Sequence, residues 1–218
     1  MDGKDVLAFR KEFYRYRAEA LAPALEERNY EVHICADGAE AKEKALSLMP
    51  EGSTVAWGGS ASVSQIGLLD AVRNGKYKAL DREAAPTPEE KEKVLRDAFS
   101  ADFYLTSFNA VSMNGMVFNV DGNGNRVAAI TFGPKYVIAI VGMNKVCLSE
   151  ESAMERSTGE AAEINAVRFK KGDTLFTDED VTDDVPSQGR ICNFLEKIAW
   201  CRNPGRIKVI LVCEDLGF

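Results

Sequence analysis

The hydrophobic pattern of the chain begins with a helical period and then alternates between strand-like and helical segments. Near the N-terminus, apolar residues recur at spacings of three and four and predict a long amphipathic helix through Val6, Phe9, Phe13, Tyr16 and Ala20. Short apolar runs predict strands at residues 30–35, 54–57 and 102–106. Capping residues, glycines and helical periodicity predict helices over residues 37–49, 60–75 and 87–99. This order is typical of a parallel sheet with right-handed crossovers.

The segment from Thr106 to Lys145 has a different pattern. It carries six Asn and five Gly residues around apolar runs at 116–120, 127–132 and 136–141. Asn and Gly adopt positive φ more readily than other residues and are frequent in tight turns. The segment therefore predicts short strands joined by turns, in a small hairpin-rich lobe whose turns carry polar side chains.

The last third of the chain predicts a helix over residues 150–170 and a solvated acidic loop over 174–188. Two apolar segments, 191–200 and 206–213, flank an Asn-Pro-Gly turn and predict a final hairpin. A helix is the competing prediction for the first of these segments, because its apolar residues also fit helical spacing.

Together these elements predict an α/β fold with a mostly parallel sheet, flanking helices and the small lobe. The chain has 218 residues, is 45% apolar and has no linker or internal repeat, so one domain over residues 1–218 is expected. A net charge of −7 argues against nucleic-acid binding. No apolar run approaches a membrane span, and the N-terminus lacks the apolar region of a signal peptide. We expect a cytoplasmic protein.

The cysteine pattern argues against a disulfide scaffold and a zinc ribbon, because five cysteines lie far apart without a CxxC motif. Cys35, Cys147 and Cys213 lie in or beside apolar runs and are expected to be buried thiols. Cys192 and Cys201 flank a polar turn and are expected to be partly exposed. The sequence does not decide whether this pair has a redox or metal-binding role. The chain has a single histidine, which excludes a His-based metal cluster.

The clearest local indication of a ligand site is a glycine turn between a predicted strand and a predicted helix. It consists of Gly58, Gly59, Ser60, Ala61 and Ser62. Free backbone N–H groups at such a turn bind phosphate or carboxylate, and the serines add hydroxyl donors. The turn is neither a Walker A loop nor a GxGxxG fingerprint. The alternative is a tight turn whose serines only cap the helix.

Further polar residues are expected to meet this turn at the carboxyl edge of the sheet. The candidates in the Asn/Gly-rich segment and the last strand are Ser107, Asn109, Asp121, Asn125, Arg126, Lys135, Lys145 and Glu214. The cations would neutralise an anionic ligand, and Glu214 is a candidate acid or base, although each could equally be an ordinary surface residue. No Ser/His/Asp triad is assembled.

Several patches of the chain resemble the LUD-domain family, which is named for lactate utilisation. They are WGGSASVSQIGLLD, the whole block from Thr106 to Lys145, INAVR at 164–168, RICN at 190–193 and PGRIKVILVCEDLGF at the C-terminus. The resemblance implies a fold similar to ribose-5-phosphate isomerase, glucosamine-6-phosphate deaminase and coenzyme A transferases. In those proteins a glycine/serine turn after a strand contacts phosphate or acyl groups, which places a ligand at residues 58–62.

The resemblance also has departures. Similar family members carry a Cys-rich segment before RICN, whereas this chain has TDEDVTDDVPSQG there, so no metal site is expected. A catalytic glutamate placed as in coenzyme A transferases is not found either.

The leading hypothesis is a LUD-domain protein that binds a small anionic metabolite, in connection with the oxidation of L-lactate to pyruvate. One alternative is a non-catalytic subunit that contacts an iron–sulfur partner protein. Another is an isomerase or transferase that acts on a sugar phosphate or an acyl thioester. The sequence names no cofactor, does not decide whether the chain is an enzyme, and leaves a homo-oligomer open.

Overall fold

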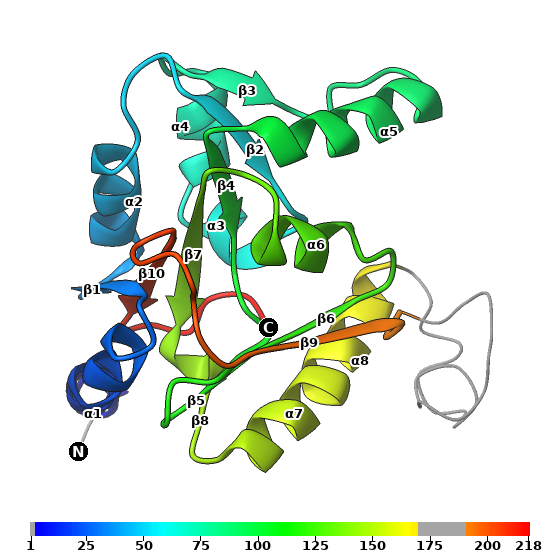
Figure 1. The fold of residues 1–218 in the computed structure, drawn as a ribbon. Helices are drawn as coiled ribbons and strands as arrows, with labels where there is room; N and C mark the ends of the chain where they lie inside the picture. The colour runs from blue at the N-terminus through cyan, green and yellow to red at the C-terminus, as the bar shows by residue number, and fades with distance from the viewer. Residues whose placement is uncertain (1–2, 170–190) are drawn as a thin grey trace.

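The computed structural model describes residues 3–169 and 191–218, which form two β-sheets with helices around them (Figure 1). The acidic loop predicted over residues 174–188 lies outside the described residues.

The larger sheet has six strands, and every neighbouring pair in it is parallel. Across the sheet the order is β1 (Glu31–Cys35), β10 (Ile207–Val212), β7 (Tyr136–Gly142), β4 (Phe103–Thr106), β2 (Thr54–Trp57) and β3 (Lys78–Leu80). The strands predicted at 30–35, 54–57 and 102–106 became β1, β2 and β4, which confirms the parallel α/β fold. The run at 136–141 was predicted for the small lobe but forms β7 within this sheet. The three-residue edge strand β3 was not predicted, because it is too short to give an alternating pattern.

Helices cover both faces of this sheet. On one face, α2 (Gly38–Ser47), α3 (Ala61–Gln65) and α4 (Leu68–Arg73) bury strand residues such as Leu105 and Ile138. On the other face, α1 (Gly3–Glu26) and α6 (Asn125–Thr131) pack against residues such as Tyr104 and Ala139. Successive strand residues point to opposite faces, so a strand buried on both sides is apolar throughout. This is why the strands appear in the sequence as continuous apolar runs.

The smaller sheet forms the predicted lobe. Its order is β8 (Val146–Cys147), β5 (Ala110–Ser112), β6 (Val117–Asp121) and β9 (Phe194–Ile198). Strands β5 and β6 form a hairpin, and β9 pairs antiparallel with the outer side of β6. Helices α7 (Glu150–Thr158) and α8 (Glu160–Arg168) follow β8, and α7 packs on this sheet (Figure 1). A further helix, α5 (Pro88–Asp97), and two short 3₁₀ turns, η1 (Ala98–Ser100) and η2 (Met143–Lys145), complete the described elements.

Two predicted elements were wrong in type. The run at residues 127–132 belongs to helix α6, because a short apolar run fits a buried helix as well as a strand. The segments 191–200 and 206–213 do not form a hairpin: β9 joins the small sheet, whereas β10 lies between β1 and β7 in the large one. The competing helix for the first segment is also wrong, since residues 194–198 form a strand.

Two predicted helices are each split. Gly67 has a φ of 69° and separates α3 from α4, and Gly159 separates α7 from α8. At Gly67 the backbone is left-handed, a conformation that cannot continue a right-handed helix and that glycine adopts at little cost. Gly159 has a φ of −95° and a ψ of −104°, which also departs from helical geometry. The helix that follows the Gly58–Ser62 turn is therefore only five residues long.

The first helix is confirmed, but its predicted apolar face is not the buried one. Tyr14, Ala18, Leu21 and Leu25 pack into the core, whereas Val6, Phe9, Phe13 and Tyr16 are each more than half exposed. Both sets have helical spacing, so periodicity alone could not choose between them.

Candidate functional site

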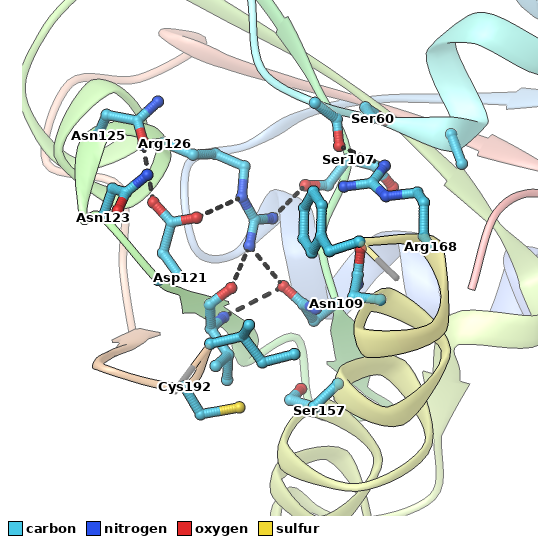
Figure 2. Close-up of a pocket in the computed structure, with 18 of the residues that line it drawn as sticks. Ser60, Ser107, Asn109, Asp121, Asn123, Asn125, Arg126, Ser157, Arg168 and Cys192 are labelled. Carbon is cyan, nitrogen blue, oxygen red and sulfur yellow. Dashed lines mark hydrogen bonds and ion pairs between the residues drawn. The ribbon is translucent and has the colours of Figure 1, made fainter. Parts of the chain in front are cut away.

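A cavity of about 650 Å³ opens at the carboxyl edge of the parallel sheet. The loops after β2, β4 and β7 contribute Ser60, Ser107 and Lys145 to its lining, and Phe218 lies beyond the end of β10. Residues of β6, α6 and α8 line the cavity as well (Figure 2). The two regions predicted to meet at this edge thus do so. Carboxyl ends of parallel strands are where α/β folds place ligands.

Most of the candidate residues line this cavity. They are Gly59, Ser60, Ser107, Asn109, Asp121, Asn125, Arg126 and Lys145. Gly58 and Ser62 lie directly behind the lining. A Cβ on Gly58 would be 3.0 Å from the Tyr104 hydroxyl, and Ser62 is fully buried against Lys145.

Two candidates lie elsewhere. Lys135 precedes β7, at the amino edge of the sheet, and its Nζ lies 5.4 Å from the centre of the Tyr136 ring. Glu214 follows β10 but turns towards the first helices, where it pairs with Lys11 at 3.0 Å and accepts a hydrogen bond from the Gly38 amide. Lys135 and Lys145 flank β7, so the strand itself holds them at opposite edges of the sheet.

The glycine turn offers fewer free amides than its sequence predicts. The Ser60 amide donates to the Gly58 carbonyl at 2.9 Å, and the Gly58 amide donates to Leu105 at 3.2 Å. The Ser60 hydroxyl accepts from the Val63 amide and so caps α3. A five-residue helix has only a small dipole, so the attraction for an anion must come from side chains.

Arg126 is the most heavily bonded side chain of the site. Its Nε lies 3.5 Å from the Asp121 carboxylate. Its Nη1 donates to the Ser107 carbonyl and the Asn119 side chain, both at 3.3 Å. Its Nη2 donates to the Asn109 Oδ1 at 2.8 Å and to the Val120 carbonyl. Every guanidinium nitrogen thus contacts a protein oxygen (Figure 2). Arg126 joins the end of β4 to β6, and its N–H groups are already used.

Two other arginines supply the positive charge that faces the cavity. A Cβ added to Gly59 would lie 2.9 Å from the Arg82 Nη2 and 3.7 Å from the Arg168 Nη2, so the two guanidinium groups converge on this glycine. Burial lowers the pKa of Arg168, and the charges of Arg82 and Arg126 lower it further. No carboxylate among residues 3–169 and 191–218 lies within ion-pair distance of Arg168.

The sequence analysis missed both arginines. Arg168 ends the INAVR patch that carried the family resemblance, which was the one available signal. Arg82 lies in an ordinary polar loop after β3, and nothing in its neighbours marks it. The Arg82 Nε lies 3.8 Å from the Glu83 carboxylate, and the same carboxylate forms a shorter ion pair of 2.7 Å with Arg73.

Lys145 lies at the base of the cavity and is only 3% exposed. Its Nζ donates to the hydroxyls of Ser62 and Ser107, both at 2.9 Å. Burial, helped by the positive charges of Arg156 and Arg126, lowers the pKa of Lys145 to about 7. A lysine amine in this setting is partly uncharged at neutral pH.

The predicted exposure of Cys192 and Cys201 was wrong, since both are buried. Cys192 borders the cavity and packs with Val120 and Ala162, whereas Cys201 belongs to the main core. None of the five cysteines forms a disulfide, and Cys147 is only partly buried, which differs from its predicted burial. Within the described ranges, no group of three or more His, Cys, Asp or Glu side chains is arranged to hold a metal ion.

The fold and the site define a class: an α/β protein with a cationic cavity at the carboxyl edge of a parallel sheet. A family model described as the LUD domain matches residues 18–212. The chain therefore belongs to the LUD-domain family, as its sequence patches indicated. The finer likeness to ribose-5-phosphate isomerase and coenzyme A transferases stays a prediction.

A solved structure supports the fold. It is a DUF162 family protein from Deinococcus radiodurans, with a TM-score of 0.54 and 15% sequence identity, and the match covers 91% of this chain and 98% of that one. At this identity the likeness concerns the fold alone. Comparison with curated proteins found no match. In the part of the chain that the structure describes, no helix is long and apolar enough to cross a membrane.

Replacing Arg126 with Ala should destabilise the protein by about 3 kcal/mol, because it leaves the Asp121 carboxylate without its counter-charge and takes one hydrogen bond from each of four other acceptors. Replacing Arg168 with Ala is the matched control and should cost less than about 1 kcal/mol, since no described carboxylate loses a partner. Urea unfolding of both variants measures the difference. Equal losses of unfolding free energy in the two variants would contradict the conclusion that Arg126 joins the end of β4 to β6.

Lys145 should make stability depend on pH. Its pKa is about 7 in the folded protein and about 10.4 in the unfolded chain. Between these values the unfolded state binds the extra proton, so stability rises with pH, by on the order of 1 kcal/mol per unit. The stability gained from the uncharged Lys145 amine is lost as the pH falls towards 7. Below pH 7 both states bind the proton, so Lys145 no longer makes stability depend on pH.

The difference in unfolding free energy between the wild type and Lys145→Met, measured from pH 7 to pH 9, isolates this contribution. Lys135→Met removes an exposed lysine and should leave the slope unchanged. A parallel pH dependence of the wild type and Lys145→Met would contradict the lowered pKa.

Proposed function

We propose that this protein binds a small anionic metabolite, with lactate and pyruvate as the first candidates, in the cavity at the carboxyl edge of its parallel sheet. The observation that carries the proposal is the convergence of the Arg82 and Arg168 guanidinium groups on Gly59. Burial is the main cause of the lowered pKa of Arg168, and repulsion by the Arg82 charge adds to it. A bound carboxylate or phosphate would offset the repulsion and accept charge-assisted hydrogen bonds from both groups.

The surrounding polar groups support the same ligand class. The Ser60 hydroxyl accepts from the Val63 amide and keeps its own proton for a ligand oxygen. The Asn109 Oδ1 accepts from Arg126 and from the Val120 amide, which fixes the side-chain amide and leaves its N–H₂ donors for the cavity. Every one of these groups offers hydrogen-bond donors, which is the complement of an oxyanion.

The size of the cavity and the family together narrow the range of candidate ligands. A volume of about 650 Å³ is larger than lactate needs and also accommodates sugar phosphates or the end of an acyl chain. The family is named for lactate utilisation, and lactate and pyruvate carry the required carboxylate. Oxidation of L-lactate to pyruvate releases two electrons, so a part in that reaction requires an electron acceptor, which a partner protein would hold.

Thermal-shift measurement tests this proposal with lactate, pyruvate, sugar phosphates and acyl-CoAs. A ligand present at 100 times its Kd should stabilise the folded protein by about 2.7 kcal/mol and raise its Tm. Gly59→Asp should abolish the shift, because the new carboxylate would lie between the two guanidinium groups. Gly59→Ala introduces only the Cβ that contacts the flexible end of Arg82 and should weaken binding less.

Arg15→Ala is the matched control for the loss of one cation, since Arg15 is exposed and pairs with Glu19 on α1, and the lining of the cavity comes from other elements. Its shift should equal that of the wild type, whereas Arg168→Ala should lose at least most of it. If no compound in the panel shifts the Tm of the folded wild type, the metabolite-binding proposal is wrong.

The second candidate function is that of a subunit that contacts an iron–sulfur partner protein. The observation that favours it is the exposed apolar side of α1, formed by Val6, Leu7, Phe9, Phe13 and Tyr16. Exposed apolar patches on soluble proteins often mark sites of protein contact.

The Phe9→Glu variant should show whether α1 contacts a partner protein without changing the stability of this chain. Phe9 is 60% exposed, so the change should alter unfolding free energy by less than about 0.5 kcal/mol. It should nevertheless reduce co-purification of an iron–sulfur protein with this chain from the source cells, detected by the visible absorbance of the cluster. Glu12→Ala, on the same helix, serves as the control. Unchanged co-purification in the Phe9 variant would remove α1 from the contact.

A further inference from the structure

Lys145 combines three properties that a structural lysine does not need. It lies at the base of the cavity, it is almost fully buried, and its hydrogen-bond partners are two hydroxyl groups. Within residues 3–169 and 191–218 it forms no ion pair with a carboxylate. Burying an unpaired ammonium costs several kcal/mol, so an uncharged amine is the favoured form of this group.

The fold holds the amine rigidly. Lys145 ends the short turn η2 directly after the central strand β7, and β7 is hydrogen-bonded to β4 and β10 on its two sides. Ser62 comes from α3 after β2, and Ser107 follows β4. Ser62 also donates to the Leu216 carbonyl, and a Cβ on Gly217 would be 3.1 Å from the Lys145 Nζ. Four strand ends thus position one amine, which is the arrangement expected of a reactive group.

Uncharged lysine amines react with carbonyl groups. An ordinary lysine with a pKa near 10.4 is uncharged in roughly one molecule in a thousand at neutral pH. A lysine whose pKa is about 7 is uncharged in a large fraction of molecules. Burial beside other cations is the known way to make a lysine nucleophilic towards carbonyl substrates.

We propose that Lys145 is a nucleophile that forms a Schiff base with the carbonyl carbon of a 2-oxo acid whose carboxylate lies on Arg82 and Arg168. This deepens the proposed function and rests on it, because the anion site is what brings the carbonyl group into the cavity. Among the candidate ligands it selects pyruvate and other 2-oxo acids over lactate, which has no carbonyl at C2.

The step is balanced without any further reactant. The Nζ lone pair forms a bond to C2, and a proton moves from Nζ to the carbonyl oxygen, relayed by the hydroxyl of Ser107, which lines the cavity. The resulting carbinolamine loses this oxygen as water, which leaves a C=N bond between C2 and Nζ. No electrons are gained or lost overall, and addition of water returns the oxo acid and the free amine.

Reductive trapping tests the proposal. The purified protein is incubated with pyruvate and sodium borohydride, and intact-protein and peptide mass spectrometry locate the adduct. One pyruvate-derived adduct per chain is expected, on the peptide that contains Lys145. Lys145→Met should lose it, while Lys135→Met, which removes an exposed lysine away from the cavity, should keep the wild-type yield.

Three further measurements separate the outcomes. Ser107→Ala removes a hydroxyl partner but keeps the amine, and it should slow trapping several-fold if the hydroxyl relays the proton. Circular dichroism shows whether Lys145→Met is folded, and Ser107→Ala serves if it is not. Gly59→Asp should lose the adduct together with the thermal shift.

A thermal shift with pyruvate but no adduct on Lys145 would overturn the Schiff base and leave the anion site intact. An absence of any thermal shift would instead remove the anion site, and with it the basis of this inference. Adducts spread over exposed lysines at the same yield as on Lys145 would also overturn the proposal, because they would reflect nonspecific chemistry.

Discussion

The site depends on the hydrogen bonding of one partly buried guanidinium, that of Arg126. Arg126 contacts the end of β4, the residue that leads into β5, and three residues of β6, so it holds the small sheet against the carboxyl edge of the large one. A planar guanidinium with five donors suits this task, because it reaches several acceptors in fixed directions at once. The cavity lies beside this joint, and its shape therefore follows from the bonds of Arg126.

The same joint explains how an acidic protein presents a cationic cavity. The chain carries 34 acidic and 27 basic residues, yet Asp121, the acidic residue among the cavity lining, is paired with Arg126. Its charge is thereby neutralised locally. Arg82, Lys91 and Arg168 then supply positive charge to the cavity lining, and they come from separate parts of the chain. In a poorly hydrated site such charges act strongly on a ligand.

The burial of each cation in the site determines whether its charged form is favoured. Arg82 and Arg168 lie towards the opening, where an anion arrives from water, and Lys145 lies at the base, where an ammonium is costly. Desolvation thus leaves the outer cations charged and favours the uncharged form of the inner one. The serines around Lys145 satisfy its hydrogen bonds without restoring the charge, as a carboxylate would.

The local features of this protein were determined by the sequence itself. Apolar runs bounded by turns located the strands of the parallel sheet, and the cap residues Asp37 and Thr87 marked the starts of α2 and α5. Such features depend on residues a few positions apart, so a single sequence contains them. The same holds for the turn at Gly58–Ser62 and for the polar residues after β4, whose meeting at one sheet edge follows from parallel pairing.

The tertiary structure decided which charges act together. Arg82 and Arg168 are 86 positions apart, and only the folding of α8 over the Gly59 turn brings them together. Arg126 could be identified as a polar candidate, but its contacts with two sheets could not. The sequence pattern likewise predicted the wrong side of α1 as buried and paired β9 with β10 in a hairpin, whereas the two strands belong to different sheets. These choices are made by packing between distant segments, and local patterns that fit two arrangements equally well carry no information about them.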